Sequence, residues 1–307
     1  IDKVSLSREY DFITAEIIEK KINTDKLDLI FNVSESEKLY VEEINILGNN
    51  VTEESVIRST LEVDEGDPYN ELLHAKSLNK IKSLNIFKTV NSEIIDGSTP
   101  ATKIININIE EKPTGEISLG AGIGSDGATI GFSVSENNFL GKGVQLSSSL
   151  RLGSDTVRGN FTINNPNFNY SGRSLSTNIS STKIDKLDTS GYESTLNALS
   201  FGTAYEKFEN LYFKPNISIS SEKIATNSTA SAPLKKQAGS FFETTFGYSL
   251  DYDLRDRSYR TKGGTRSKFT QAIPIISDDN ALYNSYEFTK WHEFDNKMVS
   301  DLGFYLA

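Results

Sequence analysis

The pattern of hydrophobic and polar positions changes at about Pro113. From residue 114 onward, apolar residues recur at every second position, as in strands with one apolar face. In the first such segment, Ile117 and Leu119 alternate with Ser118 and Gly120. We count about eleven segments of this kind, with mostly Ser, Thr, Asn, Gly, Arg and Glu at the intervening positions. The pattern predicts an all-β antiparallel region.

Two architectures use strands with one apolar face. A soluble β-sandwich buries the apolar faces in a core, whereas a transmembrane barrel turns them toward lipid around a polar lumen. The weak alternation, the many strands and the lack of covering helices favour a barrel. Such a barrel must be closed, because an open sheet edge is costly in lipid. A soluble β-sandwich is the alternative.

Residues 36–113 have a different pattern, which predicts the order β-α-α-β-β. A strand over 39–47 ends at a Gly-Asn-Asn turn, and Thr52 is expected to cap a short helix. Asn70 is expected to cap a second helix with apolar residues at three- and four-residue spacing. Two strands follow, at about 86–94 and 102–110. We expect a small, complete α+β domain.

Residues 1–35 resemble the end of the same unit. A strand pair is predicted at 15–20 and 26–33, after a helix tail over residues 1–12. This pattern matches the back half of a second copy, so we expect the chain to begin inside a repeat. The alternative is one irregular α+β domain over all 113 residues.

Composition changes at the same place as the hydrophobic pattern. Residues 1–113 hold 13 Lys and Arg against 22 Asp and Glu, whereas residues 114–307 hold 19 against 20. The second region has 18 of the 21 Gly. The net charge of −10 therefore belongs almost entirely to the first region, which looks like water-soluble domain material. An acidic chain is a poor partner for nucleic acid, and we expect none.

Several classes of site and enzyme fit the sequence poorly. The absence of Cys excludes disulfides and thiol nucleophiles, and no stretch approaches the roughly 18 apolar residues of a membrane helix. His74 and His292 lie in different regions, which makes a zinc site improbable. No Gly-x-Ser-x-Gly motif is present, and the glycines from 120 to 124 are not followed by Lys-Ser/Thr as in a phosphate loop. We expect no catalytic residue, metal or cofactor, although a dispersed Ser-His-Asp set stays open.

The motifs of the two regions together resemble a known family. Gly48-Asn49 after the first strand and Glu65-Gly66 between the helices are similar to those of a POTRA domain. The Gly-rich strand that follows it, at 115–124, makes the chain resemble the BamA family of outer-membrane protein assembly factors. Three later segments support the resemblance: Asn138–Gly143, Asn165–Phe168, and Asp256-Arg257-Ser258-Tyr259 with Gly264-Thr265-Arg266.

The resemblance implies an architecture of POTRA domains followed by a transmembrane β-barrel of about 16 strands. Only about eleven strands are predicted here, so residues 114–307 are expected to be the N-terminal part of a barrel. The family's V-R-G-[FY] motif is expected in the missing part. Val157-Arg158-Gly159-Asn160-Phe161 looks like it but has an extra Asn and lies on the fourth strand, so we interpret it as a chance match.

The resemblance also implies a seam between the first and last barrel strands, where client proteins fold. The glycines of the first strand supply no packing side chains, so weak pairing and strand addition at this edge are expected. Alternatively, the glycines make room for lumen packing or strand curvature. The residues assigned to the seam strand are Gly115, Ile117, Leu119, Gly120, Gly122, Ile123 and Gly124.

Further site residues follow from the same resemblance. Glu65 matches an acidic position that contacts a partner lipoprotein, and Arg58 lies on the preceding helix; the alternative is two solvated surface residues. The edge strand at about 87–94 is expected to bind extended clients. A charge network in the lumen is assigned to Asp256, Arg257 and Arg266, with a solvated turn as the alternative, and Gly264 is assigned to the barrel turn beside them.

The function implied is assembly and insertion of β-barrel proteins into the bacterial outer membrane, with the POTRA arm in the periplasm. Expected partners are lipoproteins of an assembly complex, unfolded outer-membrane β-barrel clients and outer-membrane lipid. Alternatives are a relative that secretes a partner protein or assembles autotransporters, a passive porin and, least favoured, an outer-membrane hydrolase.

Overall fold

The computed structural model describes residues 13–23, 26–35, 39–124, 127–257, 261–278, 281–295 and 297–307. The chain divides into two compact units. The first comprises Ile1–Thr114 with Leu140–Gly143, and the second comprises Gly115–Phe139 with Val144–Ala307. Among the described residues, no helix has the length and apolar character needed to cross a membrane.

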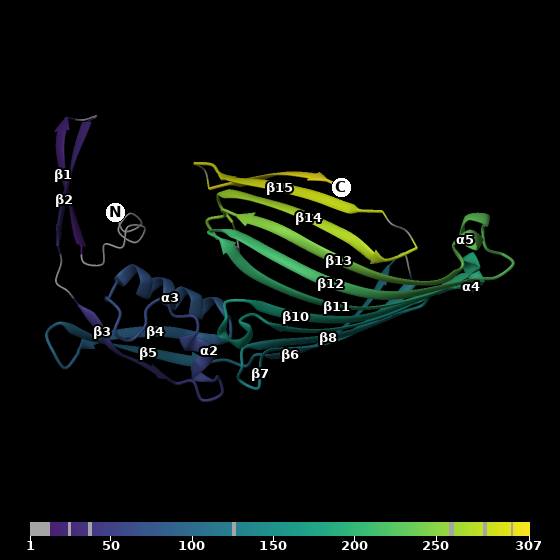
Figure 1. Ribbon diagram of the computed structural model, residues 1–307, viewed down its shortest axis with the longest axis horizontal. Helices are drawn as coiled ribbons and strands as arrows, with labels where there is room; N and C mark the ends of the chain where they lie inside the picture. Colours follow the sequence, from purple (N-terminus) through teal and green to yellow (C-terminus); the bar gives the residue numbers. More distant parts are fainter. Residues whose placement is uncertain are drawn as a thin grey trace. The chain divides into compact units, whose positions relative to one another are not determined.

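The first unit contains a three-stranded sheet with two helices, in the predicted order β-α-α-β-β. Its strands are β3 (Tyr40–Leu47), β4 (Phe87–Asp96) and β5 (Thr102–Glu111), and its helices are α2 (Glu54–Arg58) and α3 (Glu71–Ser83). The sheet order is β3-β5-β4, with β3 parallel and β4 antiparallel to β5. Figure 1 shows α3 lying along this sheet.

Isoleucine dominates the core of this unit. Ile57 of α2 and Ile81 of α3 have no exposed surface, and Ile105 and Ile107 of β5 are 1% exposed. Burial of these side chains against the central strand is what holds the helices on the sheet. Helix α3 begins where predicted, because the Asn70 side-chain oxygen accepts hydrogen bonds from the N–H groups of the second and third helical residues.

The start of α2 differs from the prediction. The N-cap residue is Glu53, with no side-chain cap, and Thr52 is not the cap. The Thr52 hydroxyl instead donates to Glu111 Oε1 at 2.6 Å, and the Thr52 N–H donates to the same oxygen at 2.7 Å. The Thr52 hydroxyl, which the local sequence predicts to cap α2, therefore bonds the carboxylate of Glu111 at the end of β5.

A separate strand pair precedes this domain. Strands β1 (Ile13–Asn23) and β2 (Lys26–Glu35) pair antiparallel, which confirms the predicted strand pair. The helix tail predicted over residues 1–12 lies outside the described residues.

The second unit is dominated by one antiparallel sheet whose strands follow one another in chain order from β6 to β16. Figure 1 shows this sheet as a single curved layer. Eleven strands are present within the described residues, in agreement with the sequence. They are β6 (Gly115–Gly124), β7 (Gly127–Phe139), β8 (Val144–Gly153), β9 (Thr156–Asn165), β10 (Ser174–Lys186), β11 (Tyr192–Phe208), β12 (Leu211–Thr226), β13 (Gly239–Asp253), β14 (Gly264–Ile276), β15 (Tyr283–Glu293) and β16 (Val299–Leu306).

Short helical turns lie in three of the connections of this sheet. They are η1 (Phe168–Tyr170), α4 (Leu187–Ser190) and α5 (Ala232–Gln237). The three family-like segments fall at strand boundaries. Residues 138–143 lead from β7 into β8, residues 165–168 end β9, and Gly264 begins β14, the ninth strand of the sheet.

The apolar face of this sheet is exposed. Phe132 of β7 and Leu150 of β8 lie in one cross-strand row, and Ile117 of β6 lies in the next row. Each of the three retains at least 43% of its accessible surface. Apart from Ala230, the buried hydrophobic residues of the described chain all belong to the first unit. No second layer covers the apolar face within the described residues, which argues against a soluble β-sandwich and for barrel strands that face lipid.

Candidate functional site

Within the described residues, strand β6 is one of the two end strands of the sheet and is exposed along its whole length. It pairs with β7 in unbroken register, with Gly120 directly opposite Gly131. Its apolar side chains are the most exposed of the sheet's first strands, with Leu119 at 78% and Ile123 at 91%. Backbone hydrogen bonds are thus the main link between β6 and the sheet.

Three glycines of β6 have empty space beside them, whereas a Cβ on Gly115 would lie 3.1 Å from the Glu136 carboxylate. A Cβ placed on Gly120 or Gly124 would meet no heavy atom within 4 Å, and one on Gly122 would reach only the Thr129 hydroxyl. Within the described residues, no side chain packs into the space that these glycines leave. The observation favours a weakly packed strand over glycines that make room for packing, and assignment of the seven residues to a seam stays a prediction.

Arg58 and Glu65, the predicted lipoprotein-contact residues, lie side by side. The guanidinium Nη1 is 3.3 Å from Glu65 Oε1, and Arg58 Nε also pairs with Glu54 at 2.6 Å on α2. Glu65 Oε1 accepts the N–H of Ile44 at 3.1 Å, while Arg58 Nη2 donates to the Ile44 carbonyl at 2.8 Å. This backbone hydrogen bond, with the guanidinium, holds the pKa of Glu65 below its ordinary value. The hydrogen bond to Glu54 raises the pKa of Arg58.

These contacts close the outer edge of β3. The loop after α2 adds two backbone hydrogen bonds, from the Val41 N–H to Asp67 and from the Gly66 N–H to Val41. The other edge strand of this sheet, β4, pairs only with β5 within the described residues. An extended chain can therefore add to β4 but not to the middle of β3.

Gly48 and Asn49 form the predicted turn after β3. Gly48 has φ +92°, and a Cβ there would overlap the Ile109 carbonyl oxygen. The Asn49 side-chain amide donates to the Thr52 carbonyl at 3.1 Å. Glycine is therefore required by close approach of the turn to β5, and the pair has a structural role in this domain.

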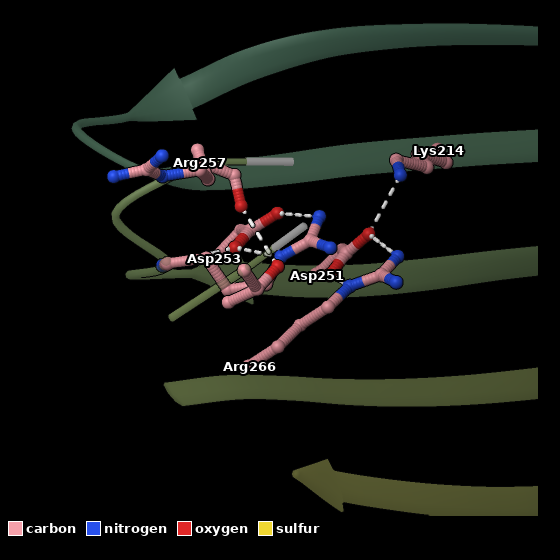
Figure 2. Close-up of polar contacts among 7 residues, drawn as sticks. Lys214, Asp251, Asp253, Arg257 and Arg266 are labelled. Atoms are coloured by element: carbon pink, nitrogen blue, oxygen red, sulfur yellow. Dashed lines mark hydrogen bonds and ion pairs between the residues drawn. The ribbon is translucent and has the colours of Figure 1, made fainter. Parts of the chain in front are cut away.

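The charged residues at the adjoining ends of β13 and β14 form two clusters rather than the one predicted. In the first, Asp251 accepts two hydrogen bonds from Arg266, at 2.8 and 2.6 Å, and an ion pair from Lys214 at 2.7 Å. Figure 2 shows Lys214 and Arg266 reaching Asp251 from the neighbouring strands. The Asp251 side chain is only 3% exposed, and its charge is compensated by direct contacts with both cations.

The second cluster organises the connection between β13 and β14. Asp256 Oδ1 accepts the N–H groups of Lys262 and Gly263 at 3.0 and 3.2 Å, and Arg257 Nε donates to Oδ2 at 2.9 Å. These backbone hydrogen bonds, with the guanidinium, hold the pKa of Asp256 at about 2. The Arg257 side chain points away from Asp251 (Figure 2). Asp256 and Arg257 therefore belong to an exposed turn, as the alternative interpretation had it, whereas Arg266 belongs to the strand cluster.

Sequence reasoning missed Lys214, Asp251 and the neighbouring pair of Asp253 with Arg255. The Arg255 guanidinium forms two hydrogen bonds to the Asp253 carboxylate, at 2.8 and 2.6 Å, and lies 5.6 Å from the centre of the Trp291 ring. The alternation of residues along β13 could have indicated these contacts. Residues 251 and 253 alternate with the apolar positions of β13 and so face the same side as their partners.

The part of the chain that the structure describes contains no group of three or more His, Asp or Glu placed to hold a metal ion. His74 lies inside the first unit, where its Nε2 is 2.8 Å from the Ser92 hydroxyl, and burial lowers its pKa. His292 stacks edge-on against Phe294 near the end of β15.

Comparisons with known proteins bear on this architecture. The chain is 26% identical over 214 residues to the outer membrane protein assembly factor BamA of Neisseria meningitidis serogroup B, covering 68% of this chain and 27% of that protein. It is 35% identical over 132 residues to BamA of Neorickettsia risticii, covering 42% of this chain and 18% of that protein. The chain thus spans only a minor part of the length of these curated relatives.

Solved structures share the fold. BamA from Haemophilus ducreyi lacking POTRA domains 1–3 superposes with a TM-score of 0.66 at 20% identity, covering 92% of this chain and 57% of that chain. CdiB from Acinetobacter baumannii gives a TM-score of 0.55 at 12% identity, covering 95% and 55%.

Family models match both units. Residues 39–112 match POTRA, the surface antigen variable number repeat, which contains β3 to β5. Residues 138–299 match the Omp85 superfamily domain, which spans most of the eleven-stranded sheet. Because this second match covers more than half of the chain, the chain belongs to the Omp85 superfamily, with a POTRA domain followed by barrel strands.

Proposed function

We propose that this chain acts in the assembly and insertion of β-barrel proteins into the bacterial outer membrane, without catalysing a chemical reaction. The observation that carries the proposal is the state of β6. Within the described residues it is an end strand, with exposed apolar residues on one face and unfilled space over Gly120, Gly122 and Gly124 on the other. Such an edge offers its N–H and C=O groups to an incoming strand. The names of the relatives, outer membrane protein assembly factors, agree with this role.

The POTRA domain has a separate part in the proposal. It lies in the periplasm, binds unfolded clients by strand addition to the open edge of β4, and contacts a partner lipoprotein through the surface around Arg58 and Glu65. Support comes from the closed edge of β3, which leaves β4 as the available edge among the described strands. Both side chains of the contact pair retain more than 40% of their accessible surface, so a partner can reach them.

Folding of the client in the membrane drives its insertion in this proposal. A client strand that adds to β6 buries its backbone polar groups in a sheet and turns one apolar face to lipid. The outward-facing residues of β6 to β8, such as Leu119 and Leu150, contact outer-membrane lipid in the same way. The free energy comes from folding of the client, so no nucleotide or other cofactor is required.

Site-specific photo-crosslinking in cells tests the seam. A photoreactive residue replaces Leu119 of β6 in one variant and Leu150 of β8 in a matched control. The two positions lie in one cross-strand row on the apolar face, through Phe132 of β7. We expect crosslinks to unfolded barrel clients at position 119 and not at 150. Equal capture at both positions, or none at 119, would show that clients do not add to β6.

A further inference from the structure

Two arginines face each other on the polar side of the sheet. Arg151 of β8 is directly opposite Arg158 of β9 in the strand register. Both are exposed. Like charges directly opposite each other destabilise an antiparallel pair. The arrangement therefore costs the fold stability and calls for a counter-charge.

The described chain does not supply that counter-charge. Neither guanidinium forms an ion pair or hydrogen bond with any described residue. On the polar face of strands β6 to β10, the one carboxylate in the described residues is Glu116, near the start of β6, which accepts a hydrogen bond from the Ser118 hydroxyl. The acidic residues Asp185 and Glu193 lie on the opposite face with Lys183.

The arginines line an open pocket with a floor of small side chains. Its lining includes Ser149 and Asn160 next to the arginines, and Gly120 and Gly131 on the neighbouring strands, with further hydroxyl groups from β6, β7 and β10. Gly131 is directly opposite Arg151, and a Cβ on either glycine would meet no heavy atom within 4 Å. No described side chain fills the space over these glycines, which adjoins the guanidiniums.

The geometry points to a binding site for an extended, acidic polypeptide segment, with Arg151 and Arg158 holding its carboxylates. A guanidinium binds a carboxylate with two parallel hydrogen bonds, and the second arginine offers the same contact one strand away. Serine hydroxyls both donate and accept hydrogen bonds, which matches the N–H and C=O groups of a peptide, whereas the Asn160 amide already bonds Thr162 and Asn178. A phosphate ion offers hydrogen-bond acceptors almost exclusively, so the accepting oxygens of this lining would have no partner in it.

The site lies close to the proposed seam, since Gly120 of β6 lines the same pocket. The proposed site depends on the proposed function in one respect only: the acidic segment is taken to belong to an unfolded client. Binding of an acidic peptide is measured without any assembly reaction, so failure of the site and failure of the proposed function are separate results.

Peptide binding to the purified protein in detergent tests the site. The probe is a short synthetic peptide of alternating Ser and Asp, and its control has Asn in place of Asp. The variants are R151Q, R158Q and the double substitution, none of which removes a partner from another residue. The matched control is K183Q, which removes one positive charge from the opposite face of β10.

We expect saturable binding of the Asp peptide that the double variant weakens by at least about tenfold and each single variant weakens less. Binding by K183Q should equal that of the wild-type protein, and added salt should weaken binding. Equal binding of the Asn peptide, or unchanged binding by the double variant, would overturn the site. Displacement of the peptide by an equal concentration of inorganic phosphate would identify a phosphate site and refute the polypeptide assignment.

Discussion

Arg58 and Glu65 meet over the backbone of a single residue of β3. Their side chains lie 3.3 Å apart, and each also bonds one backbone group of Ile44, the arginine its carbonyl and the glutamate its N–H. The pair thus does two things at once: it closes a strand edge, and it presents a fixed arrangement of charge on the surface of the POTRA domain.

Charge reversal separates these two roles. E65K removes the acceptor for the Ile44 N–H and places a cation beside Arg58, so we expect the POTRA domain to lose about 0.5–1 kcal/mol of stability. We also expect weaker co-purification of a partner lipoprotein. The matched control is E43K, at an exposed position of the same strand. Undiminished co-purification with E65K would refute the contact assignment, whereas equal loss with E43K would reduce it to a general effect of charge.

Two adjacent glycines before and at the start of β14 make a paired test of backbone conformation. Gly264 has φ +105°, and a Cβ there would overlap the Leu254 carbonyl oxygen, whereas a Cβ on Gly263 would meet nothing within 4 Å. We expect G264A to destabilise the barrel by about 1–3 kcal/mol and G263A to have little effect. The midpoint of urea unfolding, followed by gel mobility of unheated samples, measures both. Equal midpoints would mean that the connection relaxes without cost.

Asp251 is the anchor of the strand cluster, and its neutralisation should be costly. D251N leaves Lys214 and Arg266 without their shared counter-charge. We expect a loss of about 2 kcal/mol, below the figure for a fully buried pair, because the two cations are 38% and 35% exposed. The control is D301N, at an exposed position of β16. The same urea titration reports both variants, and an unchanged midpoint for D251N would show that solvent alone compensates the two cations.

The sequence predicts the strands of the large sheet well because one face of each strand is apolar. Alternation at Ile117 and Leu119 reports that face directly, and the structure places β6 at the predicted boundaries. The same logic predicts α3, since Asn70 and the apolar spacing after it are local signals. A pattern that repeats along the chain predicts a strand well because each residue lies in the same environment as its neighbours two positions away.

Contacts between distant residues are what the sequence does not predict. The local sequence predicts Thr52 to be a helix cap, but in the structure its hydroxyl donates to Glu111, which is 59 positions away. Arg266 lies close to Asp256 in the sequence, yet strand register places it opposite Asp253, from where its side chain reaches diagonally to Asp251. Register depends on the lengths of the connections and on the bulges of the neighbouring strands, and a single sequence contains no local signal for either.

His74 gives the POTRA domain a dependence on pH. Burial lowers the pKa of this imidazole, so the folded domain holds it neutral beside the Ser92 hydroxyl. As the pH falls through the ordinary pKa of about 6.5, the unfolded chain takes up a proton more readily than the folded domain does, and stability falls. We expect hydrogen-exchange protection of α3 and β4 to decrease between pH 7.5 and pH 5.5 in the wild-type protein. The H74Q variant should lack this decrease; an equal decrease in H74Q would assign the pH dependence to another group.

Filling the space over a β6 glycine tests whether weak packing of this strand matters for activity. G120V adds a β-branched side chain where nothing lies within 4 Å, and it lowers the entropy of the unfolded strand, so β6 should pair more firmly with β7. The control is G159V on β9, an interior strand, where a Cβ also meets nothing within 4 Å. If clients add at a loosely held β6, assembly of outer-membrane barrels in cells should slow with G120V and not with G159V, while both proteins stay folded. The rate at which a newly made barrel client acquires heat-modifiable mobility measures this. Unimpaired assembly with G120V would mean that the glycines serve strand curvature and that the flexibility of β6 is not used in function.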